Sequence, residues 1–329
     1  MASPEALNTY YQGFTRAFEP WPPLPLAPEP ELAWWIELLG NDPGAQRQGE
    51  PVRAALVQSL PQLRLPQASG ISSSDLYKAL VLRGEDHESE PPQWQQSEAL
   101  QLWIAPHPCG AMPVLQTPSW DDFALLVRAL AHRAEPVPLA DGVHAQAISG
   151  LIHWGLIERL GRQSRARLIV LHQAPYGSVK ARHVPGGLSD AAWLEASTTL
   201  RLEHELTHLA TKRLLGEMRL NLLDELVADG MGMVAALGGF DAALFGRCLG
   251  LGDDDQPIAK GRWLSYTKEL SADESTQAVA LVMARARELQ AQLQQHPWLL
   301  QPEQAMPRLQ WLCQQRLDAS LSPPPATPH

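Results

Sequence analysis

The chain has 329 residues, 45% of them hydrophobic, which is enough for one large domain or two ordinary ones and excludes a chain that is disordered throughout. Its formal net charge of −10 argues against nucleic acid or an anionic membrane as a partner, because both attract basic surfaces. No apolar run approaches the roughly 20 residues that span a bilayer, and we find no secretory signal.

Cysteine usage points to the compartment. Cys109, Cys248 and Cys313 are odd in number and widely spaced, so they offer neither a disulfide framework nor a paired metal site. We therefore expect a soluble protein in the reducing cytoplasm, with no nucleic acid and no membrane as a partner.

Proline, glycine and hydrophobic periodicity divide the chain into predicted elements. Ser119 and Ser189 precede helical patterns as N-caps, and Gly161 and Gly216 end two of the helices. The short apolar, β-rich run at 165–172 is the clearest strand. In chain order we expect helices at 31–40 and 53–65, a strand at 98–106, helices at 119–135 and 141–161, the strand at 165–172, and helices at 190–215 and 218–237.

These elements predict a helix-rich α+β fold with a small sheet upstream of the last two helices. Proline-rich stretches mark the ends of the chain and a loose boundary near 136–141. The expected regions are an N-terminal arm at 1–30, an N-terminal α/β region at 31–140, a third region at 141–320 and a disordered tail at 321–329.

The sequence "RLEHELTHLA" at 201–210 places His204 and His208 four residues apart on a predicted helix. Positions i and i+4 lie about 40° apart around a helix, so both imidazoles can point at one cation. This is the spacing that a helix offers to zinc. Glu205 sits about 100° further round, where it could act on a water molecule instead of the metal.

The next helix carries a matching pair of acids. Glu225 and Asp229 share one helical face, and the other residues of that face are small. Two buried carboxylates would be costly unless a positive charge lay between the helices. A metal ion held by His204 and His208 would supply that charge, whereas the alternative is a metal-free network of histidines and acids.

Residues 189–237, roughly a sixth of the chain, resemble the gluzincin zinc metallopeptidases, the thermolysin-like and aminopeptidase-like group. The HExxH motif, the short connection and the following ExxxD helix carry this resemblance, and more vaguely the chain is similar to uncharacterised bacterial proteins with the same helix pair. The resemblance implies a zincin-like domain over 141–320, in which the active-site helix faces a glutamate helix. It implies one Zn²⁺ per chain, with three ligands: His204, His208 and Glu225.

The same resemblance assigns supporting roles. It makes Glu205 the general base that activates a zinc-bound water, and it makes Asp229 and Asp224 the carboxylates that hydrogen-bond His204 and His208. Gluzincins also use a donor beyond the third ligand to stabilise the oxyanion. The segment 261–269 offers Tyr266 for this role, although an ordinary half-buried tyrosine is the alternative.

An upstream edge strand pairs with the peptide substrate in this family, and such pairing suits an extended ligand. Tyr176, Arg182 and His183 follow the predicted strand at 165–172, so we expect them to line a substrate cleft; the alternative is a solvent-exposed loop. The predicted function is zinc-dependent hydrolysis of peptide bonds in a peptide or protein substrate. The alternative is a zinc-binding fold that has lost catalysis and acts as a binding or regulatory protein.

Overall fold

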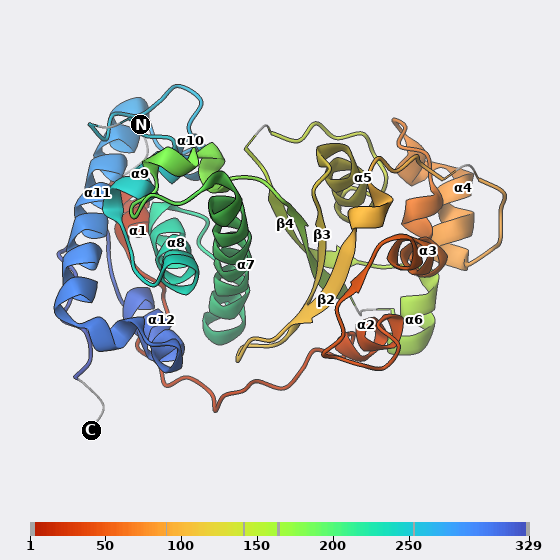
Figure 1. The fold of residues 1–329 in the computed structure, drawn as a ribbon, viewed down its shortest axis with the longest axis horizontal. Coiled ribbons are helices and arrows are strands. Elements are labelled where there is room, and N and C mark those ends of the chain that lie inside the picture. Colours follow the sequence, from red (N-terminus) through yellow and green to blue (C-terminus); the bar gives the residue numbers. More distant parts are fainter. Residues whose placement is uncertain (1–3, 90, 141, 163–164, 253, 327–329) are drawn as a thin grey trace. The chain divides into compact units, whose positions relative to one another are not determined.

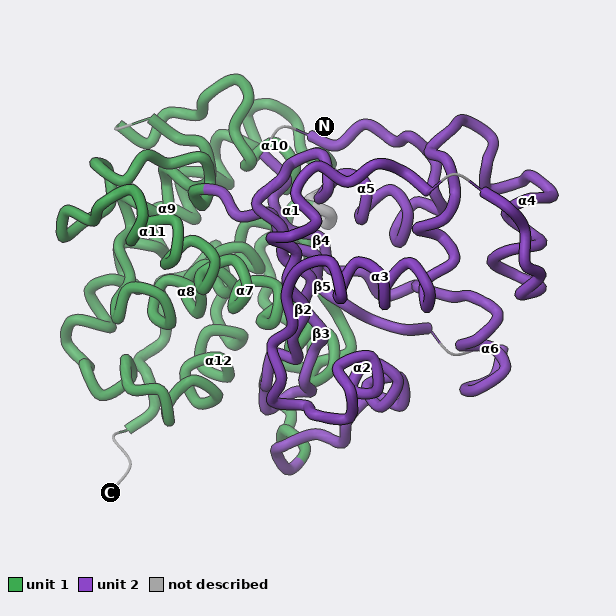
Figure 2. The backbone as a smooth tube through the Cα atoms, turned by 45° about the vertical axis from the view of Figure 1, so that its right-hand side comes forward, with its two compact units in different colours: residues 1–22, 175–329 green, residues 23–174 purple. Residues whose placement is uncertain are grey.

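The computed structural model describes residues 4–89, 91–140, 142–162, 165–252 and 254–326. The chain divides into two compact units (Figure 2). Unit 1 comprises residues 1–22 and 175–329, and unit 2 comprises residues 23–174. The fold is helix-rich with a small mixed sheet, as the sequence predicts for an α+β protein (Figure 1).

Unit 2 contains a five-stranded sheet with the order β1-β2-β3-β5-β4. Only β3 and β5 run parallel, with Val114 opposite Ile169, and the other neighbours are antiparallel. The bounds of the strands are β1 Arg47–Gln48, β2 Gln101–Ala105, β3 Met112–Thr117, β4 Ala145–Leu151 and β5 Ala166–His172.

Helix α5 covers part of this sheet and contacts β3, β4 and β5. It begins where the Ser119 hydroxyl accepts a hydrogen bond from the backbone N–H of Asp122, as expected for an N-cap. Phe123 and Leu126 of α5 pack with Leu168 and Val170 of β5 in the core of the unit. The helices of unit 2 are α2 Leu32–Leu38, α3 Glu50–Ser59, α4 Asp75–Tyr77, α5 Trp120–Ala131 and α6 Trp154–Leu160.

Unit 1 is built around two helices, α7 Asp190–Leu215 and α8 Leu222–Leu237, which pack side by side (Figure 1). The predicted signals are confirmed: Ser189 caps α7, and Gly216 ends it in the left-handed conformation. Helix α8 starts at Leu222 because Asn221 caps it. The other helices are α1 Pro4–Tyr11, α9 Ala242–Leu249, α10 Trp263–Tyr266, α11 Ala272–Gln295 and α12 Ala305–Cys313.

Helices α7 and α8 approach closely at one glycine. A Cβ atom on Gly232 would lie 2.7 Å from the carbonyl oxygen of Leu200, closer than real Cβ contacts. The small-residue face predicted for this helix therefore serves the close packing that brings the histidines and acids together.

The boundary between the units differs from the predicted one. It lies between Ala174 and Pro175, not near 136–141, because β4 and β5 complete the sheet of unit 2. The predicted helix at 141–161 was wrong: its first half forms β4, which pairs with β5, and only Trp154–Leu160 is helical. Strand pairing, a tertiary interaction, overrides local helix propensity here.

Both termini are more ordered than predicted. Residues 4–11 of the predicted arm form α1, and Arg219 donates hydrogen bonds to the carbonyl oxygens of Thr9 and Gly13. In the predicted tail, the backbone N–H of Leu321 donates to Glu288, and the Ser322 carbonyl accepts from Trp311. Residues 327–329 of that tail lie outside the described part of the chain.

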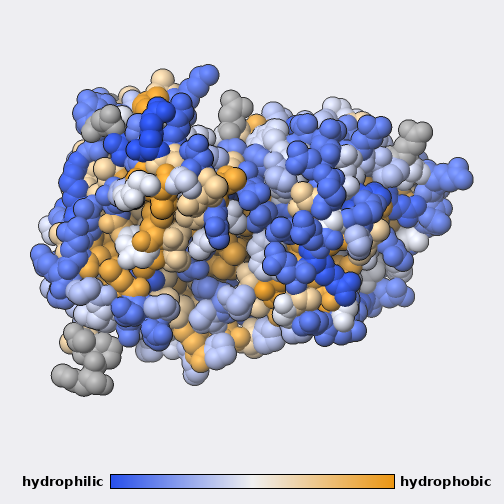
Figure 3. All heavy atoms as spheres, in the orientation of Figure 1, coloured by the Kyte–Doolittle hydropathy of each residue, from blue (hydrophilic) through white to orange (hydrophobic). Residues whose placement is uncertain are grey.

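The three cysteines, Cys109, Cys248 and Cys313, are buried, and none of them forms a disulfide within the described residues. The face shown in Figure 3 is covered largely by hydrophilic residues, with smaller hydrophobic areas between them. Within the described residues, every helix is too short or too polar to span a membrane.

Candidate metal centre

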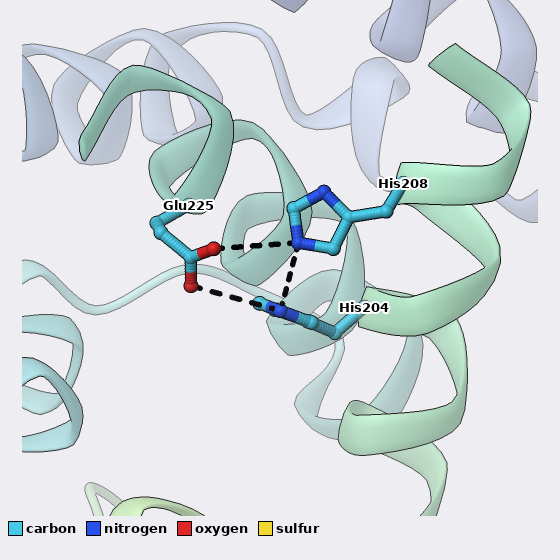
Figure 4. A group of neighbouring side chains, drawn as sticks. All are labelled: His204, His208 and Glu225. Carbon is cyan, nitrogen blue, oxygen red and sulfur yellow. Dashed lines mark hydrogen bonds and ion pairs between the residues drawn. The ribbon is translucent and has the colours of Figure 1, made fainter. Parts of the chain in front are cut away.

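Three side chains from α7 and α8 converge on one point inside unit 1 (Figure 4). The Nε2 atoms of His204 and His208 lie 3.1 Å apart. The carboxylate of Glu225 approaches both, with Oε2 at 3.7 Å from His204 Nε2 and Oε1 at 3.4 Å from His208 Nε2. All three residues are buried, so the site is shielded from bulk solvent.

The opposite nitrogens of both imidazoles face carboxylates, as predicted. His204 Nδ1 lies 2.7 Å from Asp229 Oδ1, and His208 Nδ1 lies 3.2 Å from Asp224 Oδ1. Asp224 is itself held by the backbone N–H of Leu220, at 2.9 Å from Oδ2. Such contacts hold each Nδ1 toward a carboxylate, so that each Nε2 faces Glu225, which is the arrangement a metal requires once both Nε2 atoms are deprotonated.

Tyr176 was expected to line a substrate cleft, and its position corrects that expectation. The side chain is buried, and its hydroxyl donates a hydrogen bond to Asp229 Oδ1 and lies 3.0 Å from His204 Nδ1. The guanidiniums of Arg201 and Arg262 lie over its ring, at 5.5 and 5.2 Å from the centroid. Tyr176 thus supports the histidine instead of facing a substrate.

Helix α10 brings Arg262 and Tyr266 to the same site. Arg262 Nη2 donates to Glu225 Oε2 at 2.8 Å and lies 3.2 Å from the Tyr266 hydroxyl. Burial raises the pKa of Tyr266 far above its usual value, and the charge of Arg262 opposes this increase. Tyr266 therefore remains protonated at neutral pH and can donate a hydrogen bond.

Charge interactions perturb the ligands themselves. Burial alone would lower the pKa of His208, but the hydrogen bonds to Asp224 and Glu225 outweigh it and hold this pKa well above the usual range. Burial would raise the pKa of Glu225, yet the charges of His204 and Arg262 and the hydrogen bond to His208 lower it to about 2. The site is therefore anionic and attracts protons or other cations.

The formal charges around the site indicate which cation would balance it. Four carboxylates, from Glu205, Asp224, Glu225 and Asp229, face two guanidiniums, from Arg201 and Arg262. With both imidazoles neutral, this leaves an excess of two negative charges, which one divalent cation would neutralise. Buried charge is tolerated only when it is compensated in this way.

Glu205 follows His204 on α7 and is half-buried. Burial lowers the pKa of Arg201 to about 10, and the charge of Glu205 acts in the opposite direction, so the two side chains interact electrostatically. The Glu205 carboxylate, the expected base, thus lies one helical turn from the buried guanidinium of Arg201.

The other predicted substrate residues lie on the surface of unit 1. Arg182 and His183 are exposed, and Arg182 Nε is 3.2 Å from His183 Nε2. The strand before them is β5, which pairs with β3 on one side and β4 on the other, so it has no free edge for a peptide. Among the described residues, β5 is therefore not the free edge strand that the resemblance implies upstream of the site.

Comparison with known proteins adds a family. The model of a family described as "Family of unknown function (DUF7005)" matches residues 4–166 and 162–322, which together cover almost the whole chain. The chain belongs to the DUF7005 family. No curated protein and no solved structure matches it.

One contributor to this site, Arg201, escaped the sequence analysis, and the contact that Arg262 makes was not expected. Arg201 lies three and seven residues before the histidines, so it shares their buried helical face, and an arginine on such a face was a usable signal. The contact of Arg262 with Glu225 carried no local signal, because 37 residues separate them.

Proposed function

We propose that this protein binds one Zn²⁺ through His204, His208 and Glu225 and hydrolyses peptide bonds. The observation that carries the proposal is the size of the ligand triangle. Zinc with bonds of about 2.0–2.1 Å in tetrahedral geometry holds its ligand atoms about 3.3 Å apart. The three separations here are 3.1, 3.4 and 3.7 Å.

The number of ligands favours a catalytic over a structural zinc site. Structural sites close the metal with four protein ligands, whereas catalytic sites use three and keep one position open. Among the described residues, the cluster that could hold a metal contains three such side chains. A glutamate directly after the first histidine is also superfluous in a structural site.

When bound, zinc would polarise the substrate carbonyl and acidify a water molecule. Glu205 would accept a proton from the attacking water at its carboxylate and pass it to the leaving amine. Tyr266 and Arg262 carry donors next to Glu225, and these would stabilise the oxygen that becomes negatively charged. Asp229, Asp224 and Tyr176 would keep the two imidazoles oriented throughout.

Metal analysis of the purified protein tests the first half of the proposal. We expect about one zinc per chain in wild type and a loss of bound zinc in His204→Ala, since one of three ligands is removed. A folded wild-type protein that takes up no divalent metal would favour the metal-free ion network, in which Arg262 is the counter-charge of Glu225.

A peptide-library cleavage assay tests the second half. Glu205→Gln should retain zinc but lose about 10²–10⁴-fold in rate, because it cannot accept a proton. Glu195→Gln is the matched control, since Glu195 lies on the same helix but is exposed. Zinc binding without cleavage of any library peptide would instead support a binding or regulatory protein.

A further inference from the structure

Unit 2 contains a second candidate site, formed entirely by its own residues. A pocket of about 370 Å³ opens between α2, the start of α6 and residues 58–64 and 80–86. This volume falls in the range of small-ligand sites, about 300–1,000 Å³. Its lining combines two tryptophans, Trp34 and Trp154, with His153 and a set of polar and charged side chains.

His153 is the polar group at the wall of this pocket. Its side chain is 4% exposed, and Nε2 finds no hydrogen-bond partner among the described residues. Burial lowers the pKa of His153 to about 4, so the ring is neutral at pH 7. A buried nitrogen without a partner destabilises the folded protein, and such a cost is expected where a ligand supplies the missing partner.

The tryptophans are held in place around this histidine. Trp34 packs against the His153 ring with 5.6 Å between centroids. The indole of Trp154 lies against Gly84, where a Cβ atom would be 2.4 Å from Trp154 Cδ1. Gly84 also has φ +67°, so it accommodates both the turn and the indole. Trp154 is nevertheless 40% exposed, which leaves ring surface available to a ligand.

The backbone beside the pocket is unusual as well. Residues Lys78–Arg83 form a π-helical turn that ends at Gly84, and Leu80 of this turn lines the pocket. Such turns are rare and occur frequently at functional sites. An unpartnered buried nitrogen, a fixed indole and a π-helical turn thus converge on one cavity.

Charge around the pocket selects the ligand. Arg64 and Arg159 are matched by Glu85 and Asp86 in the lining, so the pocket has no net formal charge. Arg64 Nη2 lies 2.9 Å from Asp86 Oδ1, and Arg159 pairs with Glu37. Paired guanidiniums and carboxylates disfavour a phosphate or another anion. They suit hydroxyl groups, each of which both donates and accepts hydrogen bonds.

We propose that this pocket binds a neutral saccharide, with the C–H face of one sugar ring on the indole of Trp154 and a hydroxyl group bonded to His153 Nε2, an atom closed to solvent that a small rotation of the side chain would expose to the ligand. Indole supplies a flat apolar surface with one polar edge, which fits the apolar face of a pyranose. The bound hydroxyl would satisfy the buried nitrogen. The site is independent of the metal centre in unit 1.

Ligand-observed NMR on the full chain tests this proposal, with glucose, N-acetylglucosamine and maltose as probes and inorganic phosphate as the anionic comparison. We expect saturation transfer to the ring protons of at least one sugar. Added phosphate should leave that signal unchanged. Trp154→Ala should weaken sugar binding about tenfold or more, because the stacking surface is lost. Leu264→Ala is the matched control, since Leu264 is equally exposed, at 40%, but belongs to unit 1 and does not line the pocket.

His153→Leu separates a ligand site from a structural histidine. If the nitrogen is reserved for a ligand, the leucine variant should be at least as stable as wild type while sugar binding falls, because an unsatisfied buried polar atom is replaced by an apolar group. Failure of all three sugars to bind the folded wild type would overturn the proposal. So would binding that is unchanged in Trp154→Ala, or competition by phosphate at equal concentration.

Discussion

The hydroxyl of Tyr176 donates a hydrogen bond to Asp229 Oδ1, the same oxygen that lies 2.7 Å from His204 Nδ1. A loop residue is thereby connected to His204, the first of the proposed metal ligands, through the carboxylate of the neighbouring helix. The second oxygen of Asp229 has no hydrogen-bond partner among the described residues, so the carboxylate relies on these two contacts. Tyr176 is therefore part of the support of the imidazole.

Removing this hydroxyl should weaken metal binding without unfolding the protein. Tyr176→Phe keeps the ring between the two guanidiniums, and Asp229→Asn removes the charge that orients His204. Changes in such supporting groups cost about 10–100-fold in metal affinity, and we expect the smaller value for Tyr176→Phe. Competition with a chromogenic zinc chelator measures the zinc affinity of both variants and of wild type. Equal affinities in the three proteins would contradict the role of Tyr176 and Asp229 in orienting the His204 ring.

Arg262 should stabilise the metal-free protein more than the zinc-bound one. Its guanidinium is 2.8 Å from Oε2 of the buried Glu225 carboxylate, and the Arg262 side chain itself is 20% exposed. Breaking a buried pair costs about 3–5 kcal/mol when the partner charge remains. Arg262→Gln should therefore lower the melting temperature of the metal-free protein.

Zinc should recover part of that loss, because it compensates Glu225 in place of the guanidinium. The increase in melting temperature on adding zinc should thus be larger in Arg262→Gln than in wild type, measured by scanning calorimetry. Arg316→Gln is a control, since Arg316 pairs with Asp318 at the surface, where an ion pair contributes about 0–1 kcal/mol.

Zinc binding should release a proton at neutral pH. The pKa of His208 is raised by its hydrogen bonds to Asp224 and Glu225, so the ring is protonated before metal arrives. Since zinc requires the neutral ring, affinity should rise about tenfold per pH unit until the pH passes this raised pKa. Calorimetry in two buffers of different ionisation enthalpy should give about one proton released per zinc, and fewer in Asp224→Asn.

Unit 2 should lose stability between about pH 6.5 and pH 4. Burial lowers the pKa values of His107 and His153 to about 4, from an unfolded value near 6.5. As the pH falls through this window, the unfolded chain binds protons that the folded chain cannot, so stability decreases, by up to about 3 kcal/mol per histidine. Urea unfolding at pH 7 and pH 4.5 checks this, and His153→Leu should flatten the dependence.

Two glycines of α8 provide a matched pair for the helix packing. A Cβ on Gly232 would meet the backbone oxygen of Leu200 at 2.7 Å, whereas one on Gly230 would meet the side-chain ends of Leu289 at 3.3 Å and Leu312 at 3.7 Å. Gly232→Ala should cost about 1–3 kcal/mol by separating α8 from α7. It should also weaken zinc binding, because Glu225 moves away from the histidines.

Gly230→Ala should be nearly neutral or stabilising, because alanine favours the helix by about 1 kcal/mol over glycine. Urea unfolding and zinc titration of both variants distinguish them. Equal effects of the two substitutions would show that helix contact at Gly232 is not what positions Glu225.

Local sequence signals determined the two helices of the metal centre. Ser189, Gly216 and the i, i+4 spacing of His204 and His208 depend only on neighbouring residues, and helix geometry then fixes which side chains share a face. The same reasoning indicated that Glu225 and Asp229 share a face of the next helix. For this reason the histidines and the acid pair could be named before any coordinates, whereas the resemblance to gluzincins supplied the expected roles of Glu225, Asp229 and Asp224.

Only the tertiary structure decided the rest. Residues 145–151 form a strand because β5 supplies its hydrogen-bond partners, and this pairing assigns the sheet to unit 2. Tyr176 and Arg262 reach the metal centre because chain segments 28 and 37 residues from their contacts fold back onto α7 and α8. Contacts between segments so far apart depend on packing of the whole unit, which no local pattern of residues encodes.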